Sequence, residues 1–449
     1  MKLRRSQRGA AALVVAIVLV LGMSLVAFFA NRGILFEQKT SANQYRSTRA
    51  FEVAEAGLEW AVARLNDDLF VNSACNNPGV TGDPITNSFR QRYLLPSTGI
   101  PSSFAINTST ATHAGCTIAA NGTATCSCPV AGTAPTLGSP TDERFAVRFR
   151  LGADSTTVEI LAYGCTNQGA PCDAGSSATP DATAVVRAEY KVRPKFPSTP
   201  GAGLVAGSAA TTGGSLNVIN LDVKSNGITI NSGTTVKLGT GTSVITLPGT
   251  PPNASILDND FSLRELTRAD ANGDLFFASF FGQTQAQYQA DPQTWLITSG
   301  ACGTNVRCTS CANAGGCGTA VSNAINSGVM QFWATTDVQF TTGNLPAVGT
   351  IGTPARPVIF AGSAGVELRS NVTAYGMFFV ATGTAIDNWD YAGSGSAKVY
   401  GAFVSRGDFQ KGGTGTLDLI YDANIFRTGE GLGLLVRVPG SWRDKETPF

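Results

Sequence analysis

The sequence predicts an α+β fold in which a long N-terminal helix packs on an antiparallel sheet and carries a β-rich distal domain. A charge-free run of 21 residues, Ala10–Ala30, is followed by a helical pattern that continues to about residue 70. Segments that alternate apolar and polar residues follow between residues 143 and 192. Beyond residue 200, short apolar stretches recur between Gly, Asn, Ser and Thr. This pattern favours a parallel β-solenoid and leaves a β-sandwich as the alternative.

The composition is that of an exported, turn-rich protein. Of the 449 residues only 14% are charged, while 51 are glycine, and a chain of this length can bury two or three cores. The net charge is +1 and the chain has no basic helix or RNA-binding aromatic motif, so nucleic acid is not expected as the main ligand. Ten cysteines, mostly in loop-like segments, indicate an oxidising compartment outside the cytoplasm.

The N-terminus has the properties of a single membrane-spanning helix. The apolar run is preceded by four basic residues, Lys2, Arg4, Arg5 and Arg8. At 1.5 Å per residue the run is roughly 31 Å long, which is enough to cross the hydrocarbon core of a bilayer. The positive-inside rule then holds the N-terminus in the cytoplasm and sends the body of the chain across the membrane.

Three interpretations of this start differ in where the chain is cut. A cleaved secretory signal requires a shorter apolar core and an A-x-A site, whereas Ala27–Ala30 has the wrong spacing. A plain membrane anchor leaves the small-residue junction at Arg8–Ala10 unexplained. A class III leader at residues 1–9, cut on the cytoplasmic side after Gly9, explains this junction and leaves a transmembrane helix at residues 10–30 on the mature chain.

Two segments resemble the N-terminal region of PilX-type minor pilins of type IV pilus systems. They are Gln7–Ala16 and Ala50–Leu58, the second of which reads A-F-E-V-A-E-A-G-L where the family has A-F-x-A-A-E-A-G-L. The resemblance implies that prepilin peptidase cuts between Gly9 and Ala10 and methylates the new amine of Ala10. It also implies a pilin architecture, in which a sheet packs on the C-terminal half of the long helix.

Val14 departs from the pattern of major pilins, which carry a glutamate at this fifth mature position. In that family the buried carboxylate is thought to meet the N-terminal amine of the subunit ahead, since an intramembrane charge without a partner is costly. A subunit with Val14 offers no carboxylate forward, yet it still presents the amine of Ala10 to a subunit below. The resemblance therefore implies a place at or near the fibre tip, as for the tip pseudopilin of type II secretion. A merely tolerated valine is the alternative.

The helix is predicted to continue as an amphipathic segment over residues 31–70. Glu52 and Glu55 lie largely off its apolar face, and we interpret them as solvated or ion-paired groups rather than as an acid–base pair. Gly57 costs about 1 kcal/mol relative to alanine inside a helix, which predicts close packing against the sheet. The apolar positions share one face, namely Phe51, Ala54, Leu58, Ala61 and Leu65.

Residues 71–196 are predicted to form a pilin-like β-sheet head with disulfides. A loop-rich stretch with a short helix near residues 89–95 precedes strands at 143–150, 156–163 and 182–192. His113, the single histidine of the chain, is interpreted as a solvated loop residue rather than a metal ligand. Prolines between residues 194 and 200 mark the boundary to the next domain.

Six cysteines of the head are disulfide candidates, and their connectivity stays open because six cysteines allow fifteen arrangements. A bridge between Cys165 and Cys172 would close a loop between two strands. Cys126 and Cys128 are too close to pair easily with each other, so each is expected to reach elsewhere. The other candidates in this domain are Cys75 and Cys116.

Residues 197–449 are predicted to form the distal domain, with a cysteine-containing insert at about 258–333 and helical stretches at 262–267 and 275–281. Asp270–Asp274 resembles the start of a calcium loop, but its glycine is misplaced and the final glutamate is missing, so an acidic turn is expected. The closing segment Arg437–Asp444 resembles the end of larger PilX-type proteins. A C-x5-C-x2-C-x5-C cluster is expected to form two disulfides rather than a zinc site; its members are Cys302, Cys308, Cys311 and Cys317.

These patterns predict a minor pilin that is anchored in the inner membrane before assembly and stands in the tip complex of the pilus afterwards. There it would prime assembly and present the distal domain for adhesion or partner binding. The resemblance implies other minor pilins, the major pilin and a tip adhesin as partners, with prepilin peptidase acting first. No cofactor, metal or catalytic residue is predicted.

Two alternatives stay open: a tip pseudopilin of a type II secretion system, and a membrane-anchored β-helical surface protein that binds or degrades polysaccharide. Glycoside cleavage requires convergent carboxylates. Scattered charges on glycine-rich turns are more often solvated or structural, which disfavours an enzyme. The candidate residues for the polysaccharide-degrading alternative are Asp387, Asp390 and Asp408 with Arg406 and Lys411.

Overall fold

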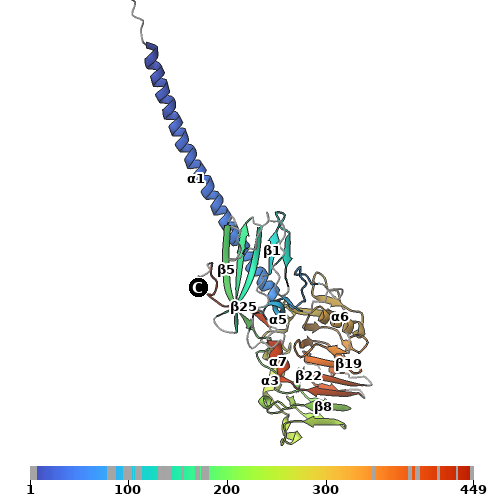
Figure 1. The fold of residues 1–449 in the computed structure, drawn as a ribbon. Helices are drawn as coiled ribbons and strands as arrows, with labels where there is room; N and C mark the ends of the chain where they lie inside the picture. The colour runs from blue at the N-terminus through green and yellow to red at the C-terminus, as the bar shows by residue number, and fades with distance from the viewer. Residues whose placement is uncertain are drawn as a thin grey trace, which may run out of the picture.

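Helix α1 (Arg8–Leu65) forms the long axis of the molecule and has 58 residues, so that it is roughly 87 Å long. Its N-terminal part projects away from the rest of the protein, while its C-terminal part lies against a sheet (Figure 1). The computed structural model describes residues 8–77, 87–94, 104, 106, 114–129, 135, 143–152, 156–166, 172, 182–345, 349–382, 387–389, 395–411, 415–430 and 433–444.

The helix ends earlier than the limit of about residue 70 that the sequence predicts. The Asp67 carboxylate accepts a hydrogen bond from the backbone N–H of Leu69 at 3.1 Å. Such a local turn competes with a further helical turn, because it offers the backbone another partner. The chain therefore leaves the helix at Leu65 and turns toward the distal domain.

A six-stranded antiparallel sheet packs on the C-terminal half of α1, with the strand order β2-β1-β3-β4-β5-β25. The apolar face predicted for the strand at 143–150 packs on the helix, since Phe145 and Val147 are buried together with Leu58 and Leu65. Burial itself does not alternate along this strand, because Arg144 and Ala146 on the other face are buried as well. The elements of this head are α2 (Phe89–Tyr93), β1 (Ala114–Ile118), β2 (Ala124–Ser127), β3 (Glu143–Leu151), β4 (Thr157–Thr166), β5 (Ala182–Arg193) and β25 (Leu434–Arg437).

Two glycines allow the helix and the sheet to approach closely. A Cβ atom on Gly57 would lie 2.8 Å from the ring of Phe145, which confirms the close packing predicted for this glycine. A Cβ atom on Gly164 of β4 would lie 2.2 Å from the carbonyl oxygen of Ala50 and 2.5 Å from the backbone nitrogen of Ala54. The second contact involves backbone atoms, which cannot rotate away, so Gly164 sets the distance between helix and sheet.

The distal domain is an insertion into the head sheet rather than a C-terminal appendage. The chain leaves β5 at Arg193 and returns at Leu434, where these two residues pair and β25 runs antiparallel to β5. The division predicted from the sequence, with a distal domain over residues 197–449, is corrected here: Leu434–Arg437 belongs to the head. Trp442 also packs edge-on against Phe51 of the helix, with ring centroids 6.3 Å apart.

The distal domain is built from parallel strands in the part of the chain that the structure describes. The largest of its sheets contains β6 (Leu204–Ala206), β8 (Ser215–Ile219), β9 (Ile230–Ser232), β11 (Thr242–Ile245), β12 (Ile256–Leu257), β13 (Thr294–Thr298), β14 (Cys308–Ser310), β15 (Gln331–Ala334), β17 (Thr350–Ile351), β18 (Val358–Gly362), β20 (Thr373–Val380), β22 (Ser396–Ser405) and β24 (Thr416–Ile420).

Smaller sheets complete the distal domain. One contains β7 (Ala210–Thr212), β10 (Val236–Leu238), β21 (Asp387–Trp389) and β23 (Phe409–Lys411). The other contains β16 (Val338–Phe340) and β19 (Val366–Leu368). Most of the apolar stretches noted in the sequence are strands, whereas residues Val223–Ser225 form a short 3-10 helix.

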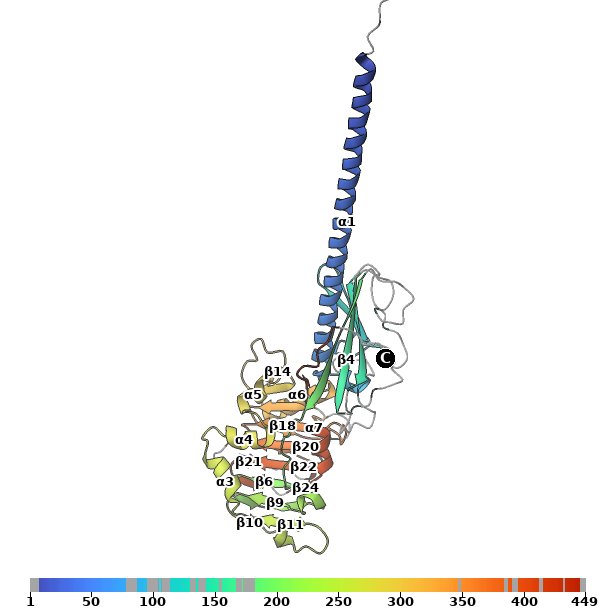
Figure 2. The same cartoon turned by 90° about the vertical axis from the view of Figure 1, so that its left-hand side faces the viewer.

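The order of the strands in space differs from their order in the chain. Strands β13, β15, β18, β20 and β22 follow one another away from α1, and the strands of residues 204–257 lie beyond them (Figure 2). Segments distant in sequence meet where the two parts join: β22 pairs with β6, β23 with β7 and β24 with β8. The Asn217 amide donates to the Asp418 carboxylate across this join at 2.7 Å.

Helices cover one face of the stack and one corner near the head. They are α3 (Phe261–Arg268), α4 (Asp274–Phe281), α5 (Gln285–Ala290), α6 (Ala314–Asn326) and α7 (Ala423–Glu430). Phe277 and Phe281 of α4 contact Phe379 of β20, which forms an aromatic core outside the sheet. The sequence predicted α3 and α4, but β13 and most of β15 fall in the expected insert at 258–333 and belong to the stack.

Candidate functional site

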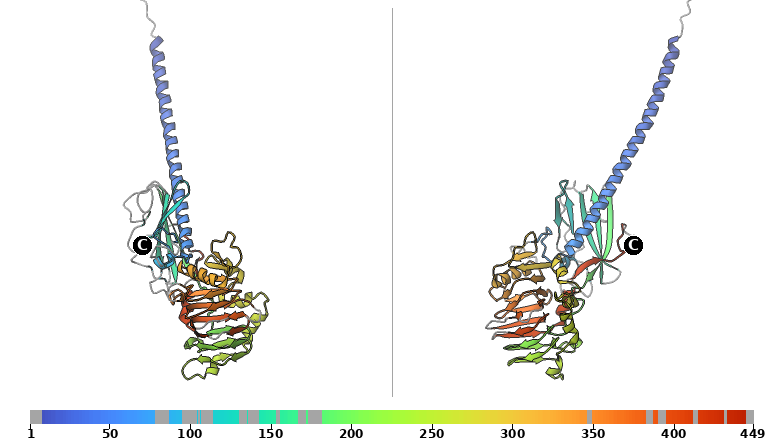
Figure 3. Two further views of the ribbon diagram at one scale, coloured as in Figure 1. Left: turned by 90° about the vertical axis from the view of Figure 1, so that its right-hand side faces the viewer. Right: turned by 180° about the vertical axis from the view of Figure 1, so that it is seen from behind.

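The N-terminal part of α1 presents an unbroken apolar surface. The window Ala12–Phe29 is long and apolar enough to cross a membrane, and its side chains pack against no other part of the described protein. The first acidic residue of the chain is Glu37. A helix that is apolar on all sides finds its favourable environment in a bilayer or against other helices, not in water. Two views from other sides also show it free of the head (Figure 3).

The residues that the sequence marks for processing lie at the start of this helix. Gly9 and Ala10 have helical backbone within α1, and the basic residues from Lys2 to Arg5 lie outside the described residues. Val14 follows one turn later and is 59% exposed. The exposed apolar part of the helix therefore carries valine at position 14, where major pilins carry a glutamate.

The other half of the helix is bound to the head by charges as well as by apolar contacts. The Arg49 guanidinium lies 2.9 Å from Glu52 and 2.7 Å from Glu143 on β3. The hydrogen bond to Glu143 is the main reason that the pKa of Arg49 is raised. Glu52 is thus a structural ion-pair partner, and Glu55 is exposed.

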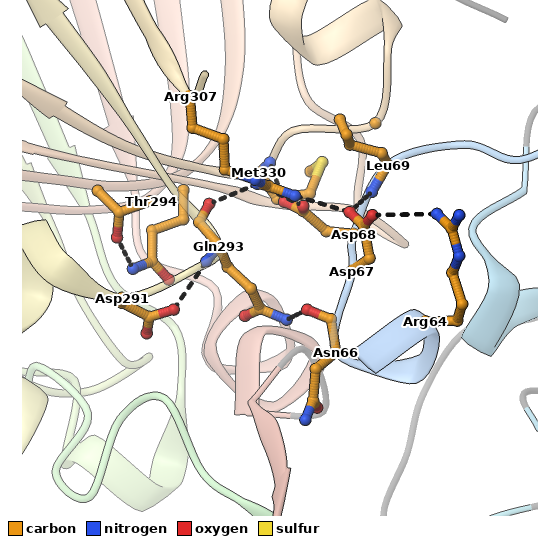
Figure 4. A network of polar contacts seen from close by, with 12 residues as sticks. Arg64, Asn66, Asp67, Asp68, Leu69, Asp291, Gln293, Thr294, Arg307 and Met330 are labelled. Atoms are coloured by element: carbon orange, nitrogen blue, oxygen red, sulfur yellow. Dashed lines mark hydrogen bonds and ion pairs between the residues drawn. The ribbon is translucent and has the colours of Figure 1, made fainter. Parts of the chain in front are cut away.

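A polar network joins the end of α1 to the distal domain (Figure 4). Arg307 donates to the carboxylates of Asp67 at 2.6 Å and Asp68 at 2.9 Å. The second oxygen of Asp68 accepts from the backbone N–H of Met330 at 3.2 Å. Burial raises the pKa of the Asp68 carboxyl, and the charge of Arg307 opposes this shift. The two carboxylates therefore hold the loop before β14 and the start of β15 against the helix end.

Asn66 connects three parts of the chain at the same place. Its side-chain oxygen accepts from the backbone N–H of Leu435 at 2.7 Å and its amide donates to the Leu435 carbonyl at 3.1 Å, so it mimics a strand partner for β25. The main-chain carbonyl of Asn66 accepts a hydrogen bond from the side-chain amide of Gln293 at 2.9 Å. The returning strand and the distal domain are consequently fixed to one residue at the helix end.

Buried cations complete this junction. Arg90 on α2 donates to the carbonyls of Leu65 at 2.9 Å and Gly433 at 2.7 Å, and burial lowers its pKa to about 10. Arg356 donates to the Gly328 carbonyl at 2.6 Å, and burial also lowers its pKa to about 10. An orientation held by buried charges is costly to change, because any movement leaves a charge unpaired.

Lys195 and Asp291 form a second buried pair at the domain boundary. Their charged atoms lie 3.0 Å apart, and both side chains are only 6% exposed. Burial lowers the pKa of Lys195, whereas the charge of Asp291 opposes this shift. The segment that follows β5 is thereby fixed to the start of the strand stack.

All ten cysteines are paired in disulfides. In the head, Cys165 is bonded to Cys172, as the sequence suggested. Cys126 and Cys128 are not bonded to each other, and each has a different partner. In the distal domain, the four-cysteine cluster forms two disulfides and no thiolate is left for zinc. The five pairs are Cys75–Cys128, Cys116–Cys126, Cys165–Cys172, Cys302–Cys308 and Cys311–Cys317.

The charged residues considered for catalysis make structural contacts where they are described. Arg406 donates to the carbonyls of Asp270 at 2.6 Å and Ala271 at 2.9 Å. Asp408 accepts from the backbone N–H of Ala209 at 2.9 Å, and Lys411 donates to the Gly415 carbonyl at 3.0 Å. These groups hold turns of the stack in place.

The remaining candidates do not form a site within the described residues. The side chain of Asp387, and all of Asp390 and His113, lie outside them. The carboxylate of Asp270 accepts from the backbone of Asn272 and Leu275, and these bonds lower its pKa as in an ordinary acidic turn. Across the described parts of the chain, no group of three His, Cys, Asp or Glu residues is arranged to hold a metal ion.

Sequence reasoning missed the junction between helix and distal domain. The only signal was the polar run Asn66–Asp68 directly after an apolar helix face. Its main partner, Arg307, is 240 residues away from Asp67 in sequence. Nothing in the neighbouring sequence distinguishes Arg307 from the other arginines and lysines of the chain.

Comparison with known proteins bears on the N-terminal segment. Residues 8–59 match the family model described as PilX N-terminal, which confirms the resemblance seen in Gln7–Ala16 and Ala50–Leu58. No curated protein gives a significant match to the chain. Among solved structures, the crystal structure of the competence-associated pilin ComZ from Thermus thermophilus matches with 12% identity and a TM-score of 0.21, over 89% of this chain and 97% of that chain.

Proposed function

We propose, on the premise that residues 8–59 are a PilX N-terminal segment, that this chain is a minor pilin of a type IV pilus and stands in its tip complex. In this role it would prime assembly and present the distal domain to the surroundings. The observation that carries the proposal is the exposed apolar part of α1, which continues into a segment locked against the head. The N-terminal half of the helix is free to pack in a filament, while the C-terminal half is packed against the head, which carries the distal domain.

The proposed processing follows from the start of the helix. Prepilin peptidase would remove residues 1–9 after Gly9 and methylate the amine of Ala10. The exposed side chains of the mature helix would then pack first in the inner membrane and later among other pilin helices. Small residues such as Ala12, Ala16 and Gly22 favour close helix approach in lipid, where no hydrophobic force drives association.

Two features support the proposed tip position: Val14 and the size of the distal domain. Without a carboxylate at this position the chain would accept a subunit below but offer no charge partner to a subunit ahead. The distal domain extends from the C-terminal end of α1, on the side away from the membrane segment. A subunit with this shape fits best where nothing stacks above it. Its proposed partners are other minor pilins, the major pilin and a tip adhesin.

We further propose that the distal domain is a β-solenoid. Leu204, Ile230 and Ile256 face one another in parallel register at intervals of 26 residues. The neighbouring strands repeat this interval, since Ala210 pairs with Val236 and Leu216 with Thr242. Parallel pairing between consecutive coils supports a solenoid over a sandwich, because sandwiches are built from antiparallel sheets. This elongated unit would serve adhesion or partner binding and not catalysis.

Immunogold labelling of intact pili tests the tip position, and Val14→Glu provides its sharpest variant. Gold against the distal domain is expected at one fibre end for the wild type. The variant regains a forward carboxylate and is therefore expected to appear along the shaft as well. Val15→Glu is the matched control, since Val15 is equally exposed at 59% but lies one residue out of position; this variant should not label the shaft. Wild-type label along the whole shaft, or identical behaviour of the two variants, would contradict the tip proposal.

A further inference from the structure

A surface groove lies between strands β13 and β14 and helix α6, at the end of the stack closest to the head. Its volume is about 510 Å³, which lies in the range of small-molecule sites. Trp295 on β13 and Ser310 on β14 line one wall, and Asn323 of α6 lines the other. None of the residues that line the groove is charged.

The groove exists because one face of α6 is built from small residues. The helix residues that line it recur at intervals of three and four, so they form a single stripe along the helix. The stripe consists of Gly316, Thr319, Ala320, Asn323, Ala324 and Ser327. Large side chains on this stripe would fill the space against Trp295.

The walls of the groove are held in fixed positions. The bond between Cys311 and Cys317 ties the end of β14 to α6, and the bond between Cys302 and Cys308 closes the preceding loop. The indole N–H of Trp295 donates to the hydroxyl of Thr309 at 2.9 Å, which sets the orientation of the ring. A site whose walls are rigid before binding loses less conformational entropy when a ligand enters.

The chemistry of the walls selects for an uncharged ligand rich in hydrogen-bonding groups. Among the described residues, the Ser310 hydroxyl and the Asn323 amide make no hydrogen bond, and both residues are exposed. An amide offers donors and an acceptor, and a hydroxyl offers both as well. The half-buried indole offers an apolar face beside these polar groups. Sugar rings combine an apolar C–H face with hydroxyls at the edge and carry no charge.

We propose that this groove binds a short neutral glycan, with Trp295 packing against a sugar face and Ser310 and Asn323 bonding its hydroxyls. The inference deepens the proposed function, since it names a ligand class for the presented domain, and its biological use rests on that function. A protein loop is less well matched. The groove offers a single large apolar side chain and no charge, whereas protein interfaces concentrate several aromatic, methionine or arginine anchors.

Calorimetric titration of the purified full-length chain in detergent tests the inference. The probes are maltotriose, cellotriose and chitotriose at up to about 10 mM, which is tenfold above a millimolar Kd. At least one is expected to bind the wild type. Thr319→Arg places a long side chain in the groove from an exposed helix position and is expected to weaken binding by about tenfold or more. Thr304→Arg is the matched control, because Thr304 is exposed in the same disulfide-tied region but does not line the groove. It should bind like the wild type.

The outcomes separate this inference from the proposed function. Binding in detergent does not depend on whether the chain enters pili, so a failure here leaves the immunogold result untouched. No binding of any of the three sugars overturns the inference, as does equal binding by the wild type and Thr319→Arg. A photo-cross-linker at Asn323 that captures a pilin in sheared pili, with no sugar binding, would assign the groove to a subunit contact instead.

Discussion

Arg307→Ala is expected to lower the free energy of unfolding of the distal domain by about 3–5 kcal/mol, because it removes the ion-pair partner of the buried Asp68 carboxylate. The side chain of Asp68 is only 9% exposed, and Arg307 lies 2.9 Å from it. Asp67 also loses Arg307, at 2.6 Å, but its side chain is 23% exposed and keeps Arg64 as a partner at 3.8 Å, so it adds less to the effect. Urea-induced unfolding of the detergent-solubilised chain, followed by tryptophan fluorescence, measures the effect.

Arg268→Ala is the control for this variant within the same domain. Arg268 pairs with Glu265 at 3.2 Å, but its side chain is 69% exposed, so the loss is expected to be at most about 1 kcal/mol. Equal effects of the two substitutions would show that the junction at the end of α1 is not held by buried charge. The proposed rigid presentation of the distal domain would then need another basis.

Gly164→Ala is expected to destabilise the head by about 3 kcal/mol or more, since overpacking against atoms that cannot move is costly. The added Cβ would meet the Ala50 carbonyl oxygen at 2.2 Å and the Ala54 nitrogen at 2.5 Å. The helix must then separate from β4, and faster cleavage by protease within the head is the expected readout.

Gly201→Ala is the matched control, because a Cβ there meets nothing within 4 Å. Its protease resistance and unfolding midpoint should equal those of the wild type. A Gly164→Ala variant that is as stable as this control would contradict the close helix–sheet contact on which the head depends.

Local patterns predicted the elements whose contacts are near in sequence. The alternation of Phe145 and Val147 identified β3, and the apolar face with Leu58 and Leu65 identified the helix side that packs on the sheet. The motif at Gly57 also indicated close packing. These predictions were correct because each depends only on the periodicity of one helix or strand.

The arrangement of the distal domain could not be predicted in the same way. The 26-residue register links only the segments near Leu204, Ile230 and Ile256, too few copies to stand out in a sequence without long identical motifs. The join between β8 and β24 connects residues 201 apart, such as Asn217 and Asp418. Pairings of this kind depend on the path of the whole chain and leave no local mark.

The placement of the last residues could not be predicted from local patterns either. The sequence assigned the last residues to the distal domain because they follow it, yet Leu435 pairs with β5 and with the side chain of Asn66. The resemblance of Arg437–Asp444 to the end of larger PilX-type proteins pointed to the family. It did not indicate that β25, which follows the inserted distal domain in the chain, pairs with β5 as a strand of the head sheet.

Mass spectrometry of the N-terminal peptide from sheared pili tests the central claim most directly. The account predicts that the chain is present in the pilus fraction and that its mature form begins at Ala10 with a methylated amine. The apolar segment Ala12–Phe29 must then remain on the mature protein. A mature chain that begins at Met1, or beyond the apolar run after Ala30, would contradict the minor pilin assignment.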